Sequence, residues 1–221
     1  MGALISLCVP VHNRTFDLKM VMSGWIEAAN NSPPVEIAIL DYNSPDDLYE
    51  YIQSLNNQNI IYRKYSGRSY YHMAHARNLS VLASNGEYIS IMSADIYASP
   101  NFIVTLREKI ATGCIWMYGR HAALLTIKRE EFMAAGGFDE RFEFYGPEDK
   151  DLNDRLRRRG LVPCWFPNVF GYNKTFDEEK VKNYRLKLSK NRMAIMMWEI
   201  YRENMAKGTL VANPEGWGKW D

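Results

Sequence analysis

The chain is poor in cysteine: it has three among 221 residues, at positions 8, 114 and 164. Three distant cysteines provide neither the disulfide framework of a small secreted domain nor a Cys-x-x-Cys metal site. Cys8 lies in an apolar run and Cys164 lies beside Trp165, so we expect buried free thiols. Free thiols are typical of a reducing compartment, and they predict a cytoplasmic protein.

Long apolar runs and a charge excess are also missing. No stretch of 18 or more apolar residues occurs, so we expect no membrane-spanning helix. Residues 1–14 lack a basic start and break at Pro10, so we expect no signal peptide. The net charge of +1, from 27 Lys and Arg against 26 Asp and Glu, indicates no overall preference for nucleic acid or an anionic membrane.

Several nucleotide and hydrolase motifs are absent. The one Gly-x-Gly, at 216–218, has no strand pattern before it and no helix pattern after it, which argues against a dinucleotide site. Neither a P-loop nor a Gly-x-Ser-x-Gly nucleophile motif occurs.

What the chain does contain is a regular alternation of apolar strand patterns and helical patterns. Hydrophobic residues make up 47% and charged residues 24%, as in a globular protein. The predicted strands are 3–9, 35–40, 59–63 and 87–92. The predicted helices are 15–29, one that the turn at 43–47 starts and that runs to about 55, 73–83, and one opening at 99–100. This alternation predicts an α/β fold with a mostly parallel, Rossmann-like sheet flanked by helices.

Ligands of such sheets gather at the carboxyl ends of the strands. Asp41 ends the second predicted strand, and Ser93-Ala94-Asp95 ends the fourth. A carboxylate at Asp95 could hold a hard cation that neutralises a diphosphate. The alternative is an Asp that only caps a turn, which is common at strand ends.

A second candidate site is the acidic segment 146–151, Gly-Pro-Glu-Asp-Lys-Asp, which opens a helix ending at Gly160. Acids at a helix start match the helix dipole, and this accounts for them without a ligand. After a Gly-Pro turn, however, Glu148 and Asp149 can face a cleft, where a carboxylate could deprotonate a hydroxyl. We expect the dipole to lower the pKa of that carboxylate.

A third candidate is Arg77, on the helix before the Asp95 strand. Its guanidinium could pair with phosphate, or it could be an ordinary surface or capping arginine. His72 and His75 lie about one helical turn apart, which suits a metal, but a third ligand is not evident nearby and we do not favour a zinc site.

The C-terminal part predicts one long helix from Asp177 to about Lys207. It carries a single apolar stripe: Met193, Met196, Met197, Ile200 and Tyr201. We expect this helix to pack on the protein itself or on a second copy as a homodimer; the alternative is a helix that binds a membrane surface or a partner. The predicted division is an α/β domain at 1–175 and a helical extension at 176–221.

Six segments together resemble the family 2 glycosyltransferases and the related β-1,4-galactosyltransferase-like enzymes, which share the GT-A fold. Residues 9–14 are similar to the signature PVYNR, and residues 40–47 to D-x-x-S-x-D. The segments 76–78, 86–89 and 93–95 follow the order ARN, GEYI and DAD, and 136–149 resembles GGFDE.F..YG.ED. The resemblance spans about residues 4–175, and it lies in the order of the motifs rather than in any one of them.

The resemblance implies a role for each matching position. Pro10, Asn13 and Asp41 would hold the nucleotide base and ribose of a nucleotide-sugar donor, with Arg77 and Ala94 near that donor. Asp95 would coordinate Mn²⁺ or Mg²⁺ on the diphosphate. Tyr145 and Glu148 would line the acceptor site. Asp149 would be the catalytic base of a single displacement with inversion.

Two positions depart from the family pattern. Ser93 stands where the first Asp of the DxD motif is usual. A metal-binding His that the family often has after the acidic pair is also missing, and Asn173 or water would fill its place. Both departures concern metal affinity.

We therefore predict an inverting, metal-dependent glycosyltransferase that uses a nucleotide sugar, with UDP-sugar as the preferred donor and a hydroxyl-bearing acceptor such as a glycan. The main alternative is a catalytically silent nucleotide-sugar-binding or scaffolding domain. A sugar-phosphate nucleotidyltransferase would require a Gly-rich loop after the first strand, where this chain has His12-Asn13-Arg14.

Overall fold

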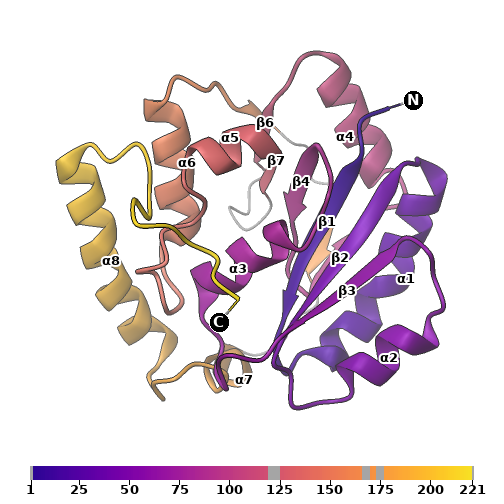
Figure 1. Cartoon of the computed structure of the whole chain (residues 1–221), viewed down its shortest axis with the longest axis horizontal. Coiled ribbons are helices and arrows are strands. Elements are labelled where there is room, and N and C mark those ends of the chain that lie inside the picture. Colours follow the sequence, from indigo (N-terminus) through magenta and orange to yellow (C-terminus); the bar gives the residue numbers. More distant parts are fainter. Residues whose placement is uncertain (1, 119–124, 166–169, 173–176, 221) are drawn as a thin grey trace.

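The computed structural model describes residues 2–118, 125–165, 170–172 and 177–220. Its centre is a seven-stranded sheet in the order β3-β2-β1-β4-β7-β6-β8 (Figure 1). The strands are β1 Ile5–Val11, β2 Val35–Tyr42, β3 Ile60–Tyr65, β4 Tyr88–Ile91, β6 Trp116–Tyr118, β7 Leu125–Lys128 and β8 Cys164–Trp165. Strands β3, β2, β1 and β4 are parallel, while β7 is antiparallel to both of its neighbours. A two-stranded sheet pairs β5, Ile96–Ala98, with β9, Phe170–Tyr172.

Helices cover both faces of the sheet. One apolar core joins β1 and β2 to α1 (Thr15–Asn31), α2 (Leu48–Ser54) and α4 (Phe102–Ala111). A second core, on the other face, joins the sheet to α3 (Met73–Leu82), α5 (Arg129–Ala134), α6 (Glu148–Arg158) and α8 (Lys190–Lys207), as Figure 1 shows. A short helix, α7 (Asp177–Val181), precedes α8. β1 and β2 are buried along their whole length, and their sequences are accordingly apolar except for the buried Ser6, Glu36 and Asp41.

The predicted free thiols are wrong for two of the three cysteines. Cys114 and Cys164 form a disulfide, and only Cys8 is a free, buried thiol. The bond joins the residues before β6 to β8, two strands that lie side by side in the sheet. Fifty residues separate the two cysteines in the sequence, so their spacing carried no sign of this pairing.

The prediction of a single C-terminal helix is also wrong, because non-helical residues separate α7, which ends at Val181, from α8, which begins at Lys190. Ser189 caps the start of α8 by accepting a hydrogen bond from the backbone nitrogen of Arg192, and Gly208 ends the helix with a φ of 61°. The buried side of α8 is narrower than the predicted stripe. Met193, Met197 and Tyr201 are buried, Ile200 is half-buried, and Met196 is exposed.

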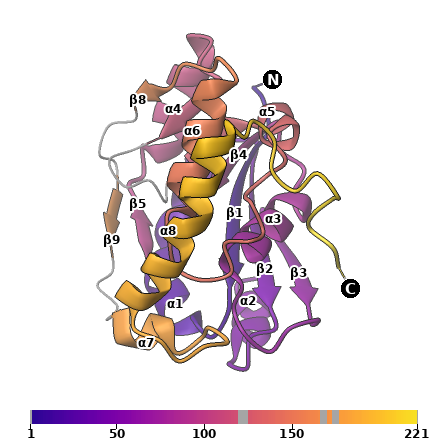
Figure 2. The ribbon, with the colours of Figure 1, turned by 90° about the vertical axis from the view of Figure 1, so that its left-hand side faces the viewer.

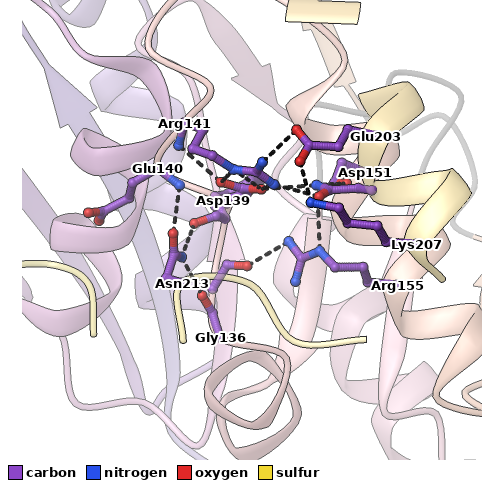
Figure 3. A network of polar contacts seen from close by, with 12 residues as sticks. Gly136, Asp139, Glu140, Arg141, Asp151, Arg155, Glu203, Lys207 and Asn213 are labelled. Atoms are coloured by element: carbon purple, nitrogen blue, oxygen red, sulfur yellow. Dashed lines mark hydrogen bonds and ion pairs between the residues drawn. The ribbon is translucent and has the colours of Figure 1, made fainter. Parts of the chain in front are cut away.

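A polar network fastens α8 to α6 (Figure 3). Asn204 of α8 donates from Nδ2 to Asp139 Oδ2 at 2.9 Å and to Asp151 Oδ1 at 2.8 Å. Arg155 is fully buried; it pairs with Asp151 at 2.8 Å and donates to the carbonyl oxygens of Ala135 and Gly137. Each buried charge in this network therefore has a partner, which is the condition for keeping it inside a fold.

No helix in the described ranges combines the length and the apolar character required to cross a bilayer.

Candidate active site

A cavity of about 620 Å³ opens at the carboxyl ends of β1 and β4. Its walls come from β1 and the loop after it, from α3, from the loop after β4, from the start of α6 and from the segment 180–198. Seven of the nine described residues in the predicted site line it: Pro10, Arg77, Ala94, Asp95, Tyr145, Glu148 and Asp149. The fold thus brings motifs far apart in the sequence around one hollow, at the edge of the sheet where ligands are expected.

Asp95 lies on one side of this cavity, in the turn that leads from β4 to β5. The turn is closed by the backbone nitrogen of Ile96, which donates to the carbonyl oxygen of Ser93. Only 5% of Asp95 is exposed, and its Oδ2 accepts from Lys180 Nζ at 2.6 Å and from Arg14 Nη2 at 3.4 Å. The strand-end carboxylate is therefore more than a turn cap: it holds two cationic side chains at the cavity wall.

The acidic pair lies at the first turn of α6, with Arg77 of α3 between its two members. Arg77 Nη1 is 3.0 Å from Glu148 Oε1 and also contacts Asp149 Oδ1. The backbone nitrogen of Gly146 donates to Glu148 Oε2 at 3.2 Å. Glu148 is almost fully buried, whereas Asp149 keeps 16% of its side chain exposed in the cavity. In this structure Arg77 thus pairs with the carboxylates of Glu148 and Asp149, and it is a buried residue rather than a surface or capping arginine.

The electrostatics of this pair reverse the expectation from the helix dipole. Burial, followed by repulsion from Asp149, raises the pKa of Glu148 to about 8, although Arg77 opposes the shift. Burial also raises the pKa of Asp149 above its ordinary value. The predicted lowering was wrong because burial, the largest cause for both carboxyls, penalises their charged form. A carboxylate with a raised pKa is a stronger base.

Asp41 and Asn13 lie outside the lining of this cavity. Asp41 lines a second, smaller cavity of about 370 Å³; it accepts from the backbone nitrogen of Ser44 at 2.6 Å and from the Tyr62 hydroxyl at 2.5 Å. Asn13 has a φ of 54°, and its Nδ2 donates to Asn183 Oδ1 at 3.1 Å. Asn173 falls outside the described residues.

His72 and His75 make hydrogen bonds within the fold. His72 caps α3 by accepting a hydrogen bond from the backbone nitrogen of His75, and burial lowers the pKa of His72 to about 3. His75 Nδ1 lies 2.7 Å from the Tyr42 hydroxyl. Across the described part of the chain, no three His, Cys, Asp or Glu side chains gather into a metal site built from protein ligands alone.

Sequence reasoning missed a whole wall of the cavity. The segment 180–198, which was predicted to be part of an extension outside the α/β domain, contributes Lys180, Tyr184, Lys190 and Trp198 among others. Nothing in the local pattern marks these residues, because they reach the cavity through the turn between α7 and α8 that the helical periodicity concealed. Arg14 belongs to a motif that was identified, but no role was assigned to it.

Comparison with known proteins agrees with this geometry. The family model described as glycosyl transferase family 2 matches residues 6–132, and the one described as the N-terminal domain of galactosyltransferase matches residues 113–179. No curated protein matches the chain in sequence.

Solved structures share the fold at low sequence identity. The mannosyltransferase PcManGT from Pyrobaculum calidifontis, solved in complex with GDP-Man and Mn²⁺, has a TM-score of 0.63 and 16% identity. The match covers 76% of this chain and 56% of that one, so the chain spans about half of the mannosyltransferase. S. aureus TarS 1–349 in complex with UDP has a TM-score of 0.65 and 13% identity, covering 97% of this chain and 76% of that one. The predicted α/β fold of the GT-A type is confirmed.

Proposed function

Because the chain belongs to glycosyl transferase family 2, we propose that it transfers a sugar from a nucleotide sugar to an acceptor hydroxyl. One observation carries the proposal. A single cavity of about 620 Å³ holds a strand-end carboxylate with two cations on one side, and an acidic pair with raised pKa values on the other. The first group suits a diphosphate, and the second suits a hydroxyl that must lose a proton.

The proposed reaction is a single displacement with inversion. The acceptor oxygen attacks the anomeric carbon, the bond from that carbon to the diphosphate oxygen breaks, and the nucleoside diphosphate leaves with the electron pair. Asp149 takes the hydroxyl proton. We assign the base to Asp149 because its side chain reaches the open cavity, whereas Glu148 is enclosed by Arg77 and the Gly146 backbone.

The donor is proposed to be a UDP-sugar. Asp41 ends β2, and the resemblance assigns the base contact to this position; its cavity offers the Asp41 carboxylate beside Tyr62 and Lys64. TarS was solved with UDP and the mannosyltransferase with GDP-Man, so relatives of this fold accept both bases. Dissociation constants for UDP and GDP decide the matter. We expect UDP to bind more tightly, and GDP binding tenfold tighter would refute the assignment.

A divalent metal fits the donor side through one residue. Mg²⁺ and Mn²⁺ are commonly held by one or two carboxylates together with substrate phosphates and water, and Asp95 supplies one carboxylate. When bound, Mn²⁺ or Mg²⁺ would neutralise charge on the leaving diphosphate. Asp95→Ala should abolish the metal-dependent part of nucleotide binding, and Ser93→Ala, the matched control, should retain it. Unchanged Mn²⁺ dependence in Asp95→Ala would exclude this role for Asp95.

The second candidate is a domain that binds nucleotide sugars without turning them over. It is favoured by Ser93 in place of an acid and by a strand-end carboxylate already engaged by Lys180 and Arg14. The test is incubation of the full chain with UDP- and GDP-sugars, with and without Mn²⁺, while released nucleoside diphosphate is measured. Release that disappears in Asp149→Asn supports the transferase. Binding without release supports the silent domain, and neither binding nor release excludes both.

The cytoplasmic location and the homodimer remain proposals, and the structure sets one condition for each. A cytoplasmic chain should carry Cys114 and Cys164 as thiols, since disulfides are rare in that compartment, so labelling of native thiols separates the two states. A homodimer through α8 would have to use its outer face, where Ile195 and Met196 are exposed, because Met197 packs into the protein itself.

A further inference from the structure

The contact between Lys180 and Asp95 connects two distant parts of the chain at the donor side of the cavity. Lys180 lies on α7, at the end of the sheet where β1 and β2 finish (Figure 1, Figure 2). Its Nζ is 2.6 Å from Asp95 Oδ2, and 35% of its side chain remains exposed. Both residues line the cavity. The ammonium group is thus fixed at one point and still accessible to a ligand.

The charges around Asp95 indicate what this ammonium group can do. Arg14 bridges Asp95 at 3.4 Å and Asp17 at 2.5 Å, so two cations and two carboxylates meet at this wall. Ser93 adds a hydroxyl and no charge. An ammonium group has three N–H donors; the bond to Asp95 uses one and leaves others for a second anion.

A cation within hydrogen-bond distance of the strand-end carboxylate is in the place where a metal ion on that carboxylate would lie. We propose that Lys180 binds the donor's diphosphate: Asp95 positions its ammonium group, and this charge lets the chain bind a nucleoside diphosphate without a divalent metal. The inference rests on the proposed function and deepens it. A metal ion at Asp95 would then supply charge to the same diphosphate in place of the ammonium group, and it is no longer the sole source of positive charge.

The experiment is calorimetric titration of the full chain with UDP, once in EDTA and once in Mn²⁺. The wild type should bind UDP in EDTA. Lys180→Gln should bind it about 10–100-fold more weakly, as the loss of a charge-assisted hydrogen bond predicts. In Mn²⁺ the same substitution should have a smaller effect, because the metal supplies charge to the same phosphates.

Lys182→Gln is the matched control, since it removes the same charge two residues away. Lys182 is exposed, pairs with Glu179 at 2.6 Å and does not line the cavity, so its replacement should leave UDP affinity unchanged in both conditions. Asp95→Asn is the second variant. It should lose the gain from Mn²⁺ and keep binding in EDTA, because an amide oxygen can still accept the hydrogen bond from Lys180 that positions its ammonium group.

The outcomes separate this inference from the function on which it rests. If the wild type binds UDP only with Mn²⁺, or if Lys180→Gln matches the wild type in EDTA, the phosphate role of Lys180 is refuted while a metal-dependent transferase stands. If neither UDP nor GDP binds under any condition, the proposed function and the role of Lys180 are refuted together.

Discussion

Replacing each of two adjacent carboxylates by its amide separates the proposed base from its neighbour. Asp149→Asn removes the acceptor of the hydroxyl proton, so turnover should fall by about 10²–10⁴-fold while UDP affinity stays the same. Glu148→Gln replaces a carboxyl that already holds a proton at neutral pH, because burial and repulsion from Asp149 raise the pKa of Glu148 to about 8. Its turnover at pH 7 should stay within about tenfold of the wild type.

The raised pKa of Glu148 also sets how much the free energy of unfolding should change with pH. In an unfolded chain the pKa of a glutamate is about 4.3, and in this fold that of Glu148 is about 8. Between these values the folded state holds a proton that the unfolded state has released, so stability is greatest below the lower pKa and falls as pH rises. One pH unit corresponds to about 1.4 kcal/mol. From pH 5 to pH 7 the wild type should therefore lose about 3 kcal/mol relative to Glu148→Gln.

Two measurements check this reasoning. Urea unfolding at pH 5, 6 and 7 gives the difference in the free energy of unfolding between the wild type and Glu148→Gln, and release of nucleoside diphosphate gives turnover. A constant difference across the three pH values would show that Glu148 is ionised throughout, which would refute its raised pKa. A rate for Asp149→Asn within threefold of the wild type would move the base to Glu148.

Three further predictions concern stability. Reduction of the Cys114–Cys164 bond, which spans 50 residues, should lower the free energy of unfolding by about 4 kcal/mol; identical urea midpoints with and without reductant would contradict this. Met197→Ala should cost about 2–5 kcal/mol and the exposed Met196→Ala less than about 0.5 kcal/mol; equal losses in urea would mean that α8 does not dock. Because the pKa of His72 is lowered to about 3, its neutral form contributes stability that is lost as pH falls below about 6.5. His72→Asn keeps a cap and should lose less stability between pH 7 and pH 5, whereas unfolding curves of equal pH dependence would exclude this.

The parts of the fold that sequence could predict are those that local chemistry determines. β1 and β2 are buried on both faces and are therefore mostly apolar in sequence, with Pro10 and Asp41 near their ends. Since parallel strands end at one edge of a sheet, the strand pattern placed Asp95 at the edge where ligands gather, and it left open whether the carboxylate faces a ligand or only caps a turn. Glu148 and Asp149 could be located at the start of a helix, because a Gly-Pro turn precedes them.

The parts that could not be predicted depend on contacts between distant segments. Lys180 and Asp95 are 85 residues apart, and a helical pattern does not show which of its residues will reach a cavity. The disulfide is a second case, since cysteine spacing identifies pairs only in dense frameworks. The raised pKa of Glu148 is a third. Helix position predicts the direction of the dipole effect, but the larger effect of burial is known only once Arg77 and the surrounding core are in place.

Two consecutive residues of α3 connect the motif at 76–78 to the motif at 136–149. Asn78 is fully buried; its Nδ2 donates to the Phe138 carbonyl oxygen at 2.9 Å, and its Oδ1 accepts from the Phe138 backbone nitrogen at 2.8 Å. Arg77 binds Glu148 and Asp149 about ten residues further on. The helix thus holds residues 138–149 at two points, through the backbone of Phe138 and through the carboxylates of Glu148 and Asp149. Arg77 and Asn78 therefore position the proposed base together. Asn78 fixes the Gly-Gly-Phe-Asp-Glu segment, and Arg77 fixes the acidic pair that follows it.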